Sequence, residues 1–152
     1  MRPLTRILAL LLLVLGADAA HAALKCKVAA TSLDFGLYSP LAAGPLDTAG
    51  TVTAQCQGGL GIVRFQLSAG SSGDATNRLM QGPGSTLGYN IYLNSARTEI
   101  WGDGSAGTRE ALRQQTRRGR MEHEVTAYGR MPPGQDAAPG FYTDDIVVTV
   151  IF

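Results

Sequence analysis

Four groups of residues in this sequence have types and spacings that could support chemistry. Cys26 and Cys56 could form a disulfide, bind a metal ion or act as a redox pair. The triplet Glu122-His123-Glu124 could supply a general base or metal ligands. The glycine-rich stretch 101–108, WGDGSAGT, could cradle a phosphate group. A polyanion could bind the arginine cluster formed by Arg113, Arg117, Arg118 and Arg120.

The patterns around these groups weigh against catalysis. On a β-strand, Glu122 and Glu124 point to one face and His123 to the other, so the three side chains do not converge on one ion. The stretch 101–108 lacks the lysine of a phosphate-binding loop, so we interpret it as a turn. No GxSxG nucleophile elbow is present for a hydrolytic triad. We therefore expect no enzymatic activity, no cofactor and no metal site.

The first 22 residues have the pattern of a secretory signal peptide. Arg2 and Arg6 precede an apolar run at residues 7–15, and Ala20-His21-Ala22 has the small-x-small pattern of a cleavage site. The apolar run is too short to span a bilayer core of about 30 Å. We expect a signal peptide at residues 1–22 and one exported domain at residues 23–152, with no membrane span.

The charge and cysteine content of that domain narrow its partners. Loss of Arg2, Arg6 and Asp18 leaves equal numbers of basic and acidic side chains, so the domain has no general attraction to nucleic acid or anionic membranes. In an exported protein the two cysteines favour a structural disulfide over a metal site or a redox pair. Such a bridge would close a loop of about 30 residues, worth roughly 3.5 kcal/mol in the chain-entropy account.

Short alternating apolar runs separated by Gly, Pro, Asn and Asp predict an all-β sandwich. The clearest run is residues 145–152, in which Ile146, Val148, Val150 and Phe152 share one face. The stretch 108–118 has good helix propensity but little apolar surface, so we expect a long polar loop with one helical turn at most. The expected strands are residues 24–29, 51–56, 62–68, 87–93, 121–130 and 145–152, with shorter ones at 33–37 and 78–81.

Five segments occur in order along the chain: LDFGLYSP (33–40), TVTAQC (51–56), NRLMQG (77–82), LGYNIYLNSARTEIWGDG (87–104) and AYGRMPPGQDAAPGFYTDDIVVTVIF (127–152). Together they resemble the spore coat protein U domain family, which includes subunits of archaic, Csu-type chaperone–usher pili. The resemblance implies an immunoglobulin-like β-sandwich that lacks its last strand. A donor strand completes it, first from a periplasmic chaperone and then from a neighbouring subunit.

The resemblance also implies roles for individual residues. Cys26 and Cys56 match the family's disulfide, and the C-terminal carboxylate is expected to meet basic residues of the chaperone. The donor-strand groove would be lined by Ile146, Val148, Val150 and Phe152. The implied partners are a periplasmic chaperone, an outer-membrane usher and other pilus or coat subunits, with no nucleic acid. The implied location is the cell surface, a pilus or the medium, reached through the periplasm.

The segment before Cys26 bears on the place of this subunit in an assembly. After cleavage only residues 23–25 would precede Cys26, which is about 10 Å of extended chain and too little to fill a neighbour's groove. We therefore expect a subunit that receives a strand and does not give one. A tip pilin and a non-polymerising coat protein both fit this expectation.

An alternative function belongs to a different class. The chain could be a secreted carbohydrate- or polyanion-binding β-sandwich. Such a module would use the loops around Trp101 together with Arg113, Arg117, Arg118 and Arg120.

Overall fold

The computed structural model describes residues 22–152 of the chain. The expected signal peptide therefore lies almost entirely outside the described residues. Within residues 22–152, no helix has the length and hydropathy that a membrane span requires.

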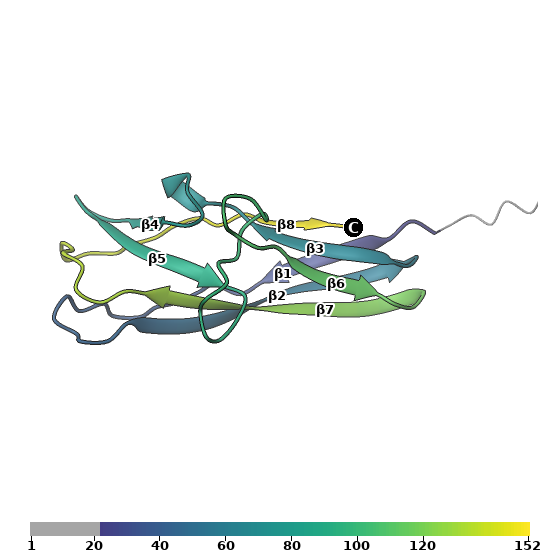
Figure 1. Ribbon diagram of the computed structural model, residues 1–152, viewed down its shortest axis with the longest axis horizontal. Coiled ribbons are helices and arrows are strands. Elements are labelled where there is room, and N and C mark those ends of the chain that lie inside the picture. Colours follow the sequence, from purple (N-terminus) through teal and green to yellow (C-terminus); the bar gives the residue numbers. More distant parts are fainter. Residues whose placement is uncertain (1–21) are drawn as a thin grey trace, which may run out of the picture.

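Two antiparallel sheets pack face to face (Figure 1). The larger sheet has the strand order β1-β2-β7-β5-β4 and the smaller one the order β6-β3-β8. One short 3₁₀-helix, η1, spans Gly70–Ser72. The strands are β1 (Lys25–Ala30), β2 (Leu46–Gly58), β3 (Gly61–Leu67), β4 (Arg78–Gln81), β5 (Thr86–Tyr92), β6 (Ala111–Gln115), β7 (Gly119–Met131) and β8 (Val148–Ile151).

The core lies between the sheets and follows the two-residue period of the strands. β2 and β7 pair along all 13 residues and form the backbone of the larger sheet. Every second side chain of the central strands points inward, where it is removed from water. The buried apolar residues of these strands include Val52, Ala54 and Cys56 of β2, Val63, Phe65 and Leu67 of β3, and Val125 and Ala127 of β7.

Trp101 closes one side of the sandwich. Its side chain is fully buried, and its indole Nε1 donates a hydrogen bond of 2.9 Å to the carbonyl oxygen of Phe65 in β3. Its backbone N–H donates to the carbonyl of Ile91 in β5 at 2.8 Å. The residue therefore ties the larger sheet to the smaller one through two hydrogen bonds that are shielded from water.

The all-β sandwich predicted from the sequence is confirmed, and most strands lie close to their expected places. The strands expected at 24–29, 62–68, 78–81, 87–93 and 121–130 are all present, with bounds shifted by no more than two residues. The strand expected at 51–56 is longer, because Leu46–Gly50 also pairs with β7.

Three expectations about secondary structure are wrong. Residues 108–118 contain strand β6 instead of a polar loop, because Ala111–Gln115 pairs with the edge of β3 and so satisfies its backbone there. Residues 33–37 form no strand, since Gly36 has a positive φ of 70° and its N–H bonds the Asp34 carboxylate. The final strand is shorter than expected, because ladder pairing with β3 begins only at Val148.

Candidate functional site

The expected disulfide is present and ties the first strand to the sandwich. Cys26 of β1 and Cys56 of β2 are directly opposite each other in the strand register and are bonded to each other. Cys56 is fully buried, so the bridge fastens β1 to the centre of the core.

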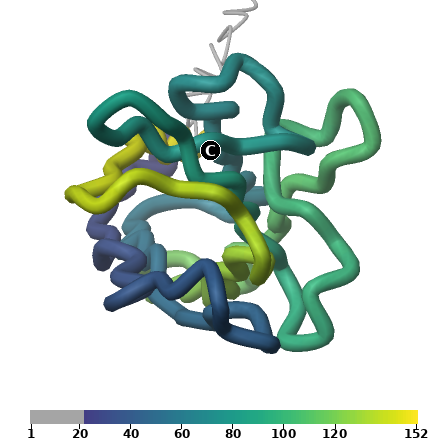
Figure 2. The backbone as a smooth tube through the Cα atoms, turned by 90° about the vertical axis from the view of Figure 1, so that its left-hand side faces the viewer, coloured from purple at the N-terminus to yellow at the C-terminus, as the bar shows by residue number. Residues whose placement is uncertain are grey.

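β1 and β8 are edge strands that lie on the same side of the molecule. β1 pairs only with β2, and β8 pairs only with β3. Viewed along the long axis, the purple N-terminal strand and the yellow C-terminal segment lie on one side of the sandwich (Figure 2). In the described part of the chain, no backbone hydrogen bond joins residues 23–35 to residues 144–152. On this side the backbones of the two edges are therefore not hydrogen-bonded to each other.

The inward-facing side chains of these two edges are incompletely covered. Val28 of β1 is opposite the fully buried Ala54, so it faces the core, yet it is 45% exposed. On the other edge, Val148 and Val150 are opposite the buried Leu67 and Phe65 but are themselves only half-buried. Apolar side chains that face a core and remain in contact with water mark a place where the packing is incomplete.

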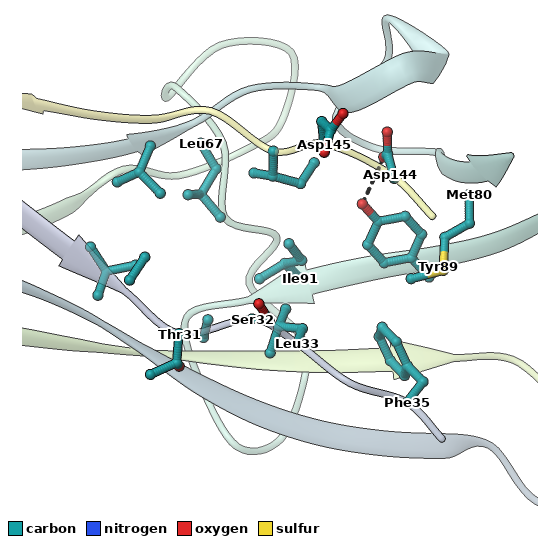
Figure 3. A pocket seen from close by; sticks show the side chains of 15 residues that line it. Thr31, Ser32, Leu33, Phe35, Leu67, Met80, Tyr89, Ile91, Asp144 and Asp145 are labelled. Atoms are coloured by element: carbon teal, nitrogen blue, oxygen red, sulfur yellow. Dashed lines mark hydrogen bonds between the residues drawn. The ribbon is translucent and has the colours of Figure 1, made fainter. Parts of the chain in front are cut away.

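A cavity of about 330 Å³ lies between the two edges (Figure 3). One wall is residues 30–35, which follow β1, and the other is residues 144–148, which lead into β8. We call this space and its continuation the groove. Its floor is largely apolar and is formed by Val52, Leu67, Met80, Tyr89, Ile91 and Ala127.

The groove continues toward one end of the molecule as a second cavity of about 920 Å³. Ser32, Leu33, Phe35 and Met80 line both cavities, so the two spaces are contiguous. The walls here are residues 32–40 on one side and residues 137–142 on the other.

Phe35 fixes the first wall although its segment forms no strand. Its ring lies edge-on to Tyr89, with 5.8 Å between the ring centroids. It also lies over Gly129 of β7, where an added Cβ would come within 2.8 Å of the ring. The absence of a side chain at Gly129 lets the aromatic ring pack directly on the sheet. Residues 33–35 are thereby held by packing in place of strand pairing.

The second wall is held by Asp144. Its carboxylate accepts a hydrogen bond of 2.7 Å from the Tyr89 hydroxyl (Figure 3). It also accepts one of 2.8 Å from the backbone N–H of Ser71. Burial raises the pKa of Tyr89 far above its ordinary value, and the hydrogen bond to Asp144 raises it further. Tyr89 is therefore a neutral donor, suited to hold an ionised carboxylate at the edge of an apolar groove.

A further contact secures the segment before this wall. Thr143 and Gln81 of β4 exchange two backbone hydrogen bonds, of 2.8 and 3.0 Å. Further along, the Ser68 hydroxyl accepts a bond of 2.9 Å from the backbone N–H of Val147. Residues 143–147 are thus fixed to β4 and β3, and the opposite edge of the segment borders the groove.

The family comparison gives a direct result: the family model described as Spore Coat Protein U domain matches residues 12–149. The chain belongs to the Spore Coat Protein U domain family. No curated protein sequence matches it.

A solved structure shares the fold of this Spore Coat Protein U domain. It is the crystal structure of the CsuC-CsuE chaperone–tip adhesion subunit pre-assembly complex from archaic chaperone–usher Csu pili of Acinetobacter baumannii. The matched chain has 19% sequence identity and a TM-score of 0.59. The match covers 86% of this chain and 40% of that chain, so this chain spans less than half of its relative's length.

The four residues predicted to line a donor-strand groove occupy different positions in this Spore Coat Protein U domain. Ile146 and Val148 line the smaller cavity. Val150 packs against the core further along β8. Phe152 follows the last strand residue, is 52% exposed and lines neither cavity.

Sequence reasoning missed the opposite wall and the polar contacts. The sequence predicted only a short strand at residues 33–37, and the alternation of Leu33 and Phe35 was the available signal for an inward-facing wall. Nothing local to Tyr89 or Asp144 indicates their contact, because 55 residues separate them in the sequence.

The Glu122-His123-Glu124 triplet lies on β7 away from the groove. As the alternation predicted, His123 is buried while both glutamates are exposed on the other face. His123 Nε2 lies 2.8 Å from Oε1 of Gln115. Burial, with a smaller effect of Arg113, lowers the pKa of His123 below its ordinary value. Across residues 22–152, no group of three or more His, Cys, Asp or Glu side chains is placed to hold a metal ion.

The alternative function, a carbohydrate- or polyanion-binding module, has no exposed tryptophan to use within residues 22–152. Trp101 is fully buried and contacts the core, so its side chain is not available to stack on a sugar or a base. The turn after it is held by Asp103, whose carboxylate accepts a bond of 2.9 Å from the Ser105 N–H. Carbohydrate binding by the loops around Trp101 stays a prediction, and it could not use the indole ring.

The arginine cluster lies on the β6–β7 hairpin, and all four side chains are exposed. The exposed Glu122 and Glu124 lie on the same hairpin, so its surface carries both signs of charge. The Arg113 guanidinium donates a hydrogen bond of 3.0 Å to the backbone carbonyl of Glu124. Polyanion binding by Arg113, Arg117, Arg118 and Arg120 stays a prediction.

Proposed function

We propose that this chain is a non-catalytic structural subunit of a chaperone–usher assembly, and that its groove accepts an extended strand from another protein. The observation that carries this proposal is the unpaired side of the sandwich. There β1 and β8 are both edge strands whose inward-facing apolar side chains are incompletely covered, and a cavity lined by residues 30–35 and 144–148 lies beside them.

An extended strand fits the geometry of this groove. Unpaired strand edges offer rows of backbone donors and acceptors, and natural proteins rarely leave such edges uncovered. A strand placed between the walls could hydrogen-bond along an edge, while every second side chain would enter the apolar floor. The two walls together run along residues 30–40 and 137–148, which gives room for several consecutive side chains.

The proposed donors are a periplasmic chaperone during export and another subunit after assembly at the outer-membrane usher. Membership of the Spore Coat Protein U domain family supports this assignment. The fold shared with a chain of a chaperone–tip adhesion subunit complex supports it as well. The proposed location is accordingly the cell surface or a pilus, reached through the periplasm.

The proposal can be tested with strand peptides. The exported protein, with its disulfide intact, is heated alone and with a saturating peptide of alternating apolar residues, and a scrambled peptide of the same composition is the control. A ligand present at 100 times its Kd stabilises the folded state by about 2.7 kcal/mol. We expect the alternating peptide to raise the Tm by roughly 5–15 °C.

The scrambled peptide should leave the Tm unchanged. If no alternating peptide of any length or register raises the Tm, the groove does not accept a strand and the proposal is wrong.

A further inference from the structure

The charged residues that line the groove all carry the same sign. The two cavities together include Asp34, Asp144 and Asp145 in their linings and no lysine or arginine. The domain as a whole has balanced charge, so this local excess is a property of the groove. A surface with one sign of charge selects a partner with the opposite sign.

These three carboxylates are not in direct contact with a cationic side chain within the described residues. None of the three takes part in an ion pair there. Asp34 accepts a hydrogen bond from the Gly36 N–H, and Asp144 is held by the neutral Tyr89 and Ser71. The Asp145 side chain is drawn at the rim of the groove, beside Asp144 (Figure 3).

Arg78 is close enough to Asp144 for the two charges to interact, but its hydrogen bonds are made to other groups. Its guanidinium is fully buried and donates to the carbonyls of Ser68, Ala75 and Trp101 and to Asn90 Oδ1. Asp144 shares no hydrogen bond with it. Each carboxylate oxygen can accept more than one hydrogen bond, so Asp144 and Asp145, which both line the cavity, retain acceptor capacity for an incoming group.

We propose that the strand occupying this groove carries a lysine or arginine at the level of Asp144 and Asp145, within an otherwise alternating apolar sequence. This inference rests on the proposed function and specifies its ligand. The aliphatic stem of the cation would lie along the apolar floor near Met80 and Tyr89, and its charged end would reach the two carboxylates.

The two other classes of side chain fit this position less well. An apolar side chain would cover Asp144 and remove its carboxylate from water without supplying a countercharge. A glutamate or aspartate would place a third negative charge beside Asp144 and Asp145, and such like-charge contacts act against the wrong partner. A cation at this position therefore selects the correct strand and its register together.

The experiment is a scan of matched peptides against the exported protein with its disulfide intact. Each peptide has the same alternating apolar sequence, and a single position along it is changed to Lys, Leu or Glu. The Kd is measured by fluorescence anisotropy at about 50 mM and about 300 mM NaCl, between which screening of partly exposed charges increases. We expect one position at which the Lys peptide binds about tenfold more tightly than the Glu peptide, with a smaller ratio at high salt.

Variants of the protein test whether the preference for the Lys peptide over the Glu peptide comes from the groove carboxylates. Asp144→Asn removes the charge, and its single amide oxygen can still accept from the Ser71 N–H while its NH2 group donates to the Tyr89 hydroxyl. Asp145→Asn removes the neighbouring charge. Each should reduce the Lys-to-Glu ratio, and Glu122→Gln, outside the groove, should not. If Asp144→Asn proves unstable, Asp145→Asn alone still decides the question.

The outcomes separate this inference from the function on which it rests. Equal binding of Lys and Glu peptides at every position, or a preference that survives both Asp→Asn variants, overturns the inference and leaves strand acceptance standing. Failure of every peptide to bind overturns both.

Discussion

At the scale of single residues, a few buried polar groups hold the domain together. Arg78 is fully buried, and its hydrogen bonds join β4 to the loops that contain Ser68, Ala75 and Trp101. A planar guanidinium can satisfy several acceptors at once, which a lysine cannot. Asp144 similarly joins the last segment of the chain to β5 and η1. These residues position the groove without lining a reactive site.

His123 gives the domain a predicted dependence on pH. Because its pKa is lowered in the folded state, the unfolded chain takes up a proton first as the pH falls through about 6.5. We expect the free energy of unfolding to decrease by up to about 1 kcal/mol between about pH 7.5 and pH 5.5. Urea denaturation at several pH values measures this change.

The matched control is His123→Gln, which keeps a polar side chain beside Gln115. The pKa values of Asp47, Asp74 and Asp103 are lowered by their hydrogen bonds, so these carboxylates titrate below this pH range. A variant with the same pH dependence as the unmodified protein would show that His123 is not the source.

At the scale of elements, the two faces of the last strand have different roles. Val148 and Val150 face the core beside the groove, whereas Val147 points outward and is 63% exposed. Neighbouring residues of this extended segment therefore point to opposite faces, one bordering the groove and the other in water.

This difference predicts unequal effects of the same substitution. Val148→Asp or Val150→Asp should abolish capture of the subunit by its chaperone, because a buried unpaired charge costs several kcal/mol. Val147→Asp should leave capture nearly unchanged. A pull-down from the periplasm with the tagged chaperone measures both, and undiminished capture of the Val148 and Val150 variants would contradict the groove assignment.

At the scale of the whole molecule, the sandwich is closed on one side and open on the other. On the closed side, the hydrogen bonds of Trp101 link β5 to β3. The Gln81–Thr143 bridge additionally joins β4 to the C-terminal segment. Between residues 23–35 and 144–152 no such backbone link is present in the described chain. The least stable part of the fold should therefore be the pair of edges that border the groove.

Hydrogen exchange tests this picture of the whole domain. We expect the amides of β1 and β8 to exchange about tenfold faster, or more, than those of β2 and β7 in the isolated protein. A bound strand peptide should slow exchange at both edges and change β2 and β7 little. Uniform protection across all four strands without any peptide would mean that the core is already complete.

The sequence by itself was enough for the class of fold, the disulfide and most of the strands. The two-residue alternation in stretches such as residues 62–68 and 121–130 reflects one buried and one exposed face, and that requirement is local to each strand. The alternation of Ile146 and Val148 likewise marked two residues that line the groove. The same alternation correctly placed His123 on the buried face of its strand and Glu122 and Glu124 on the exposed face.

Only the tertiary structure determined what depends on partners distant in the sequence. Residues 111–115 have the composition of a polar loop and become a strand because the edge of β3 is available to pair with them. Residues 33–35 form a wall through packing on Tyr89 and Gly129. The Tyr89–Asp144 bond and the fully buried Trp101 depend in the same way on contacts made across the sandwich. The local sequence pattern determines which side chains need burial. The packing of the two sheets determines which of those side chains stay incompletely buried.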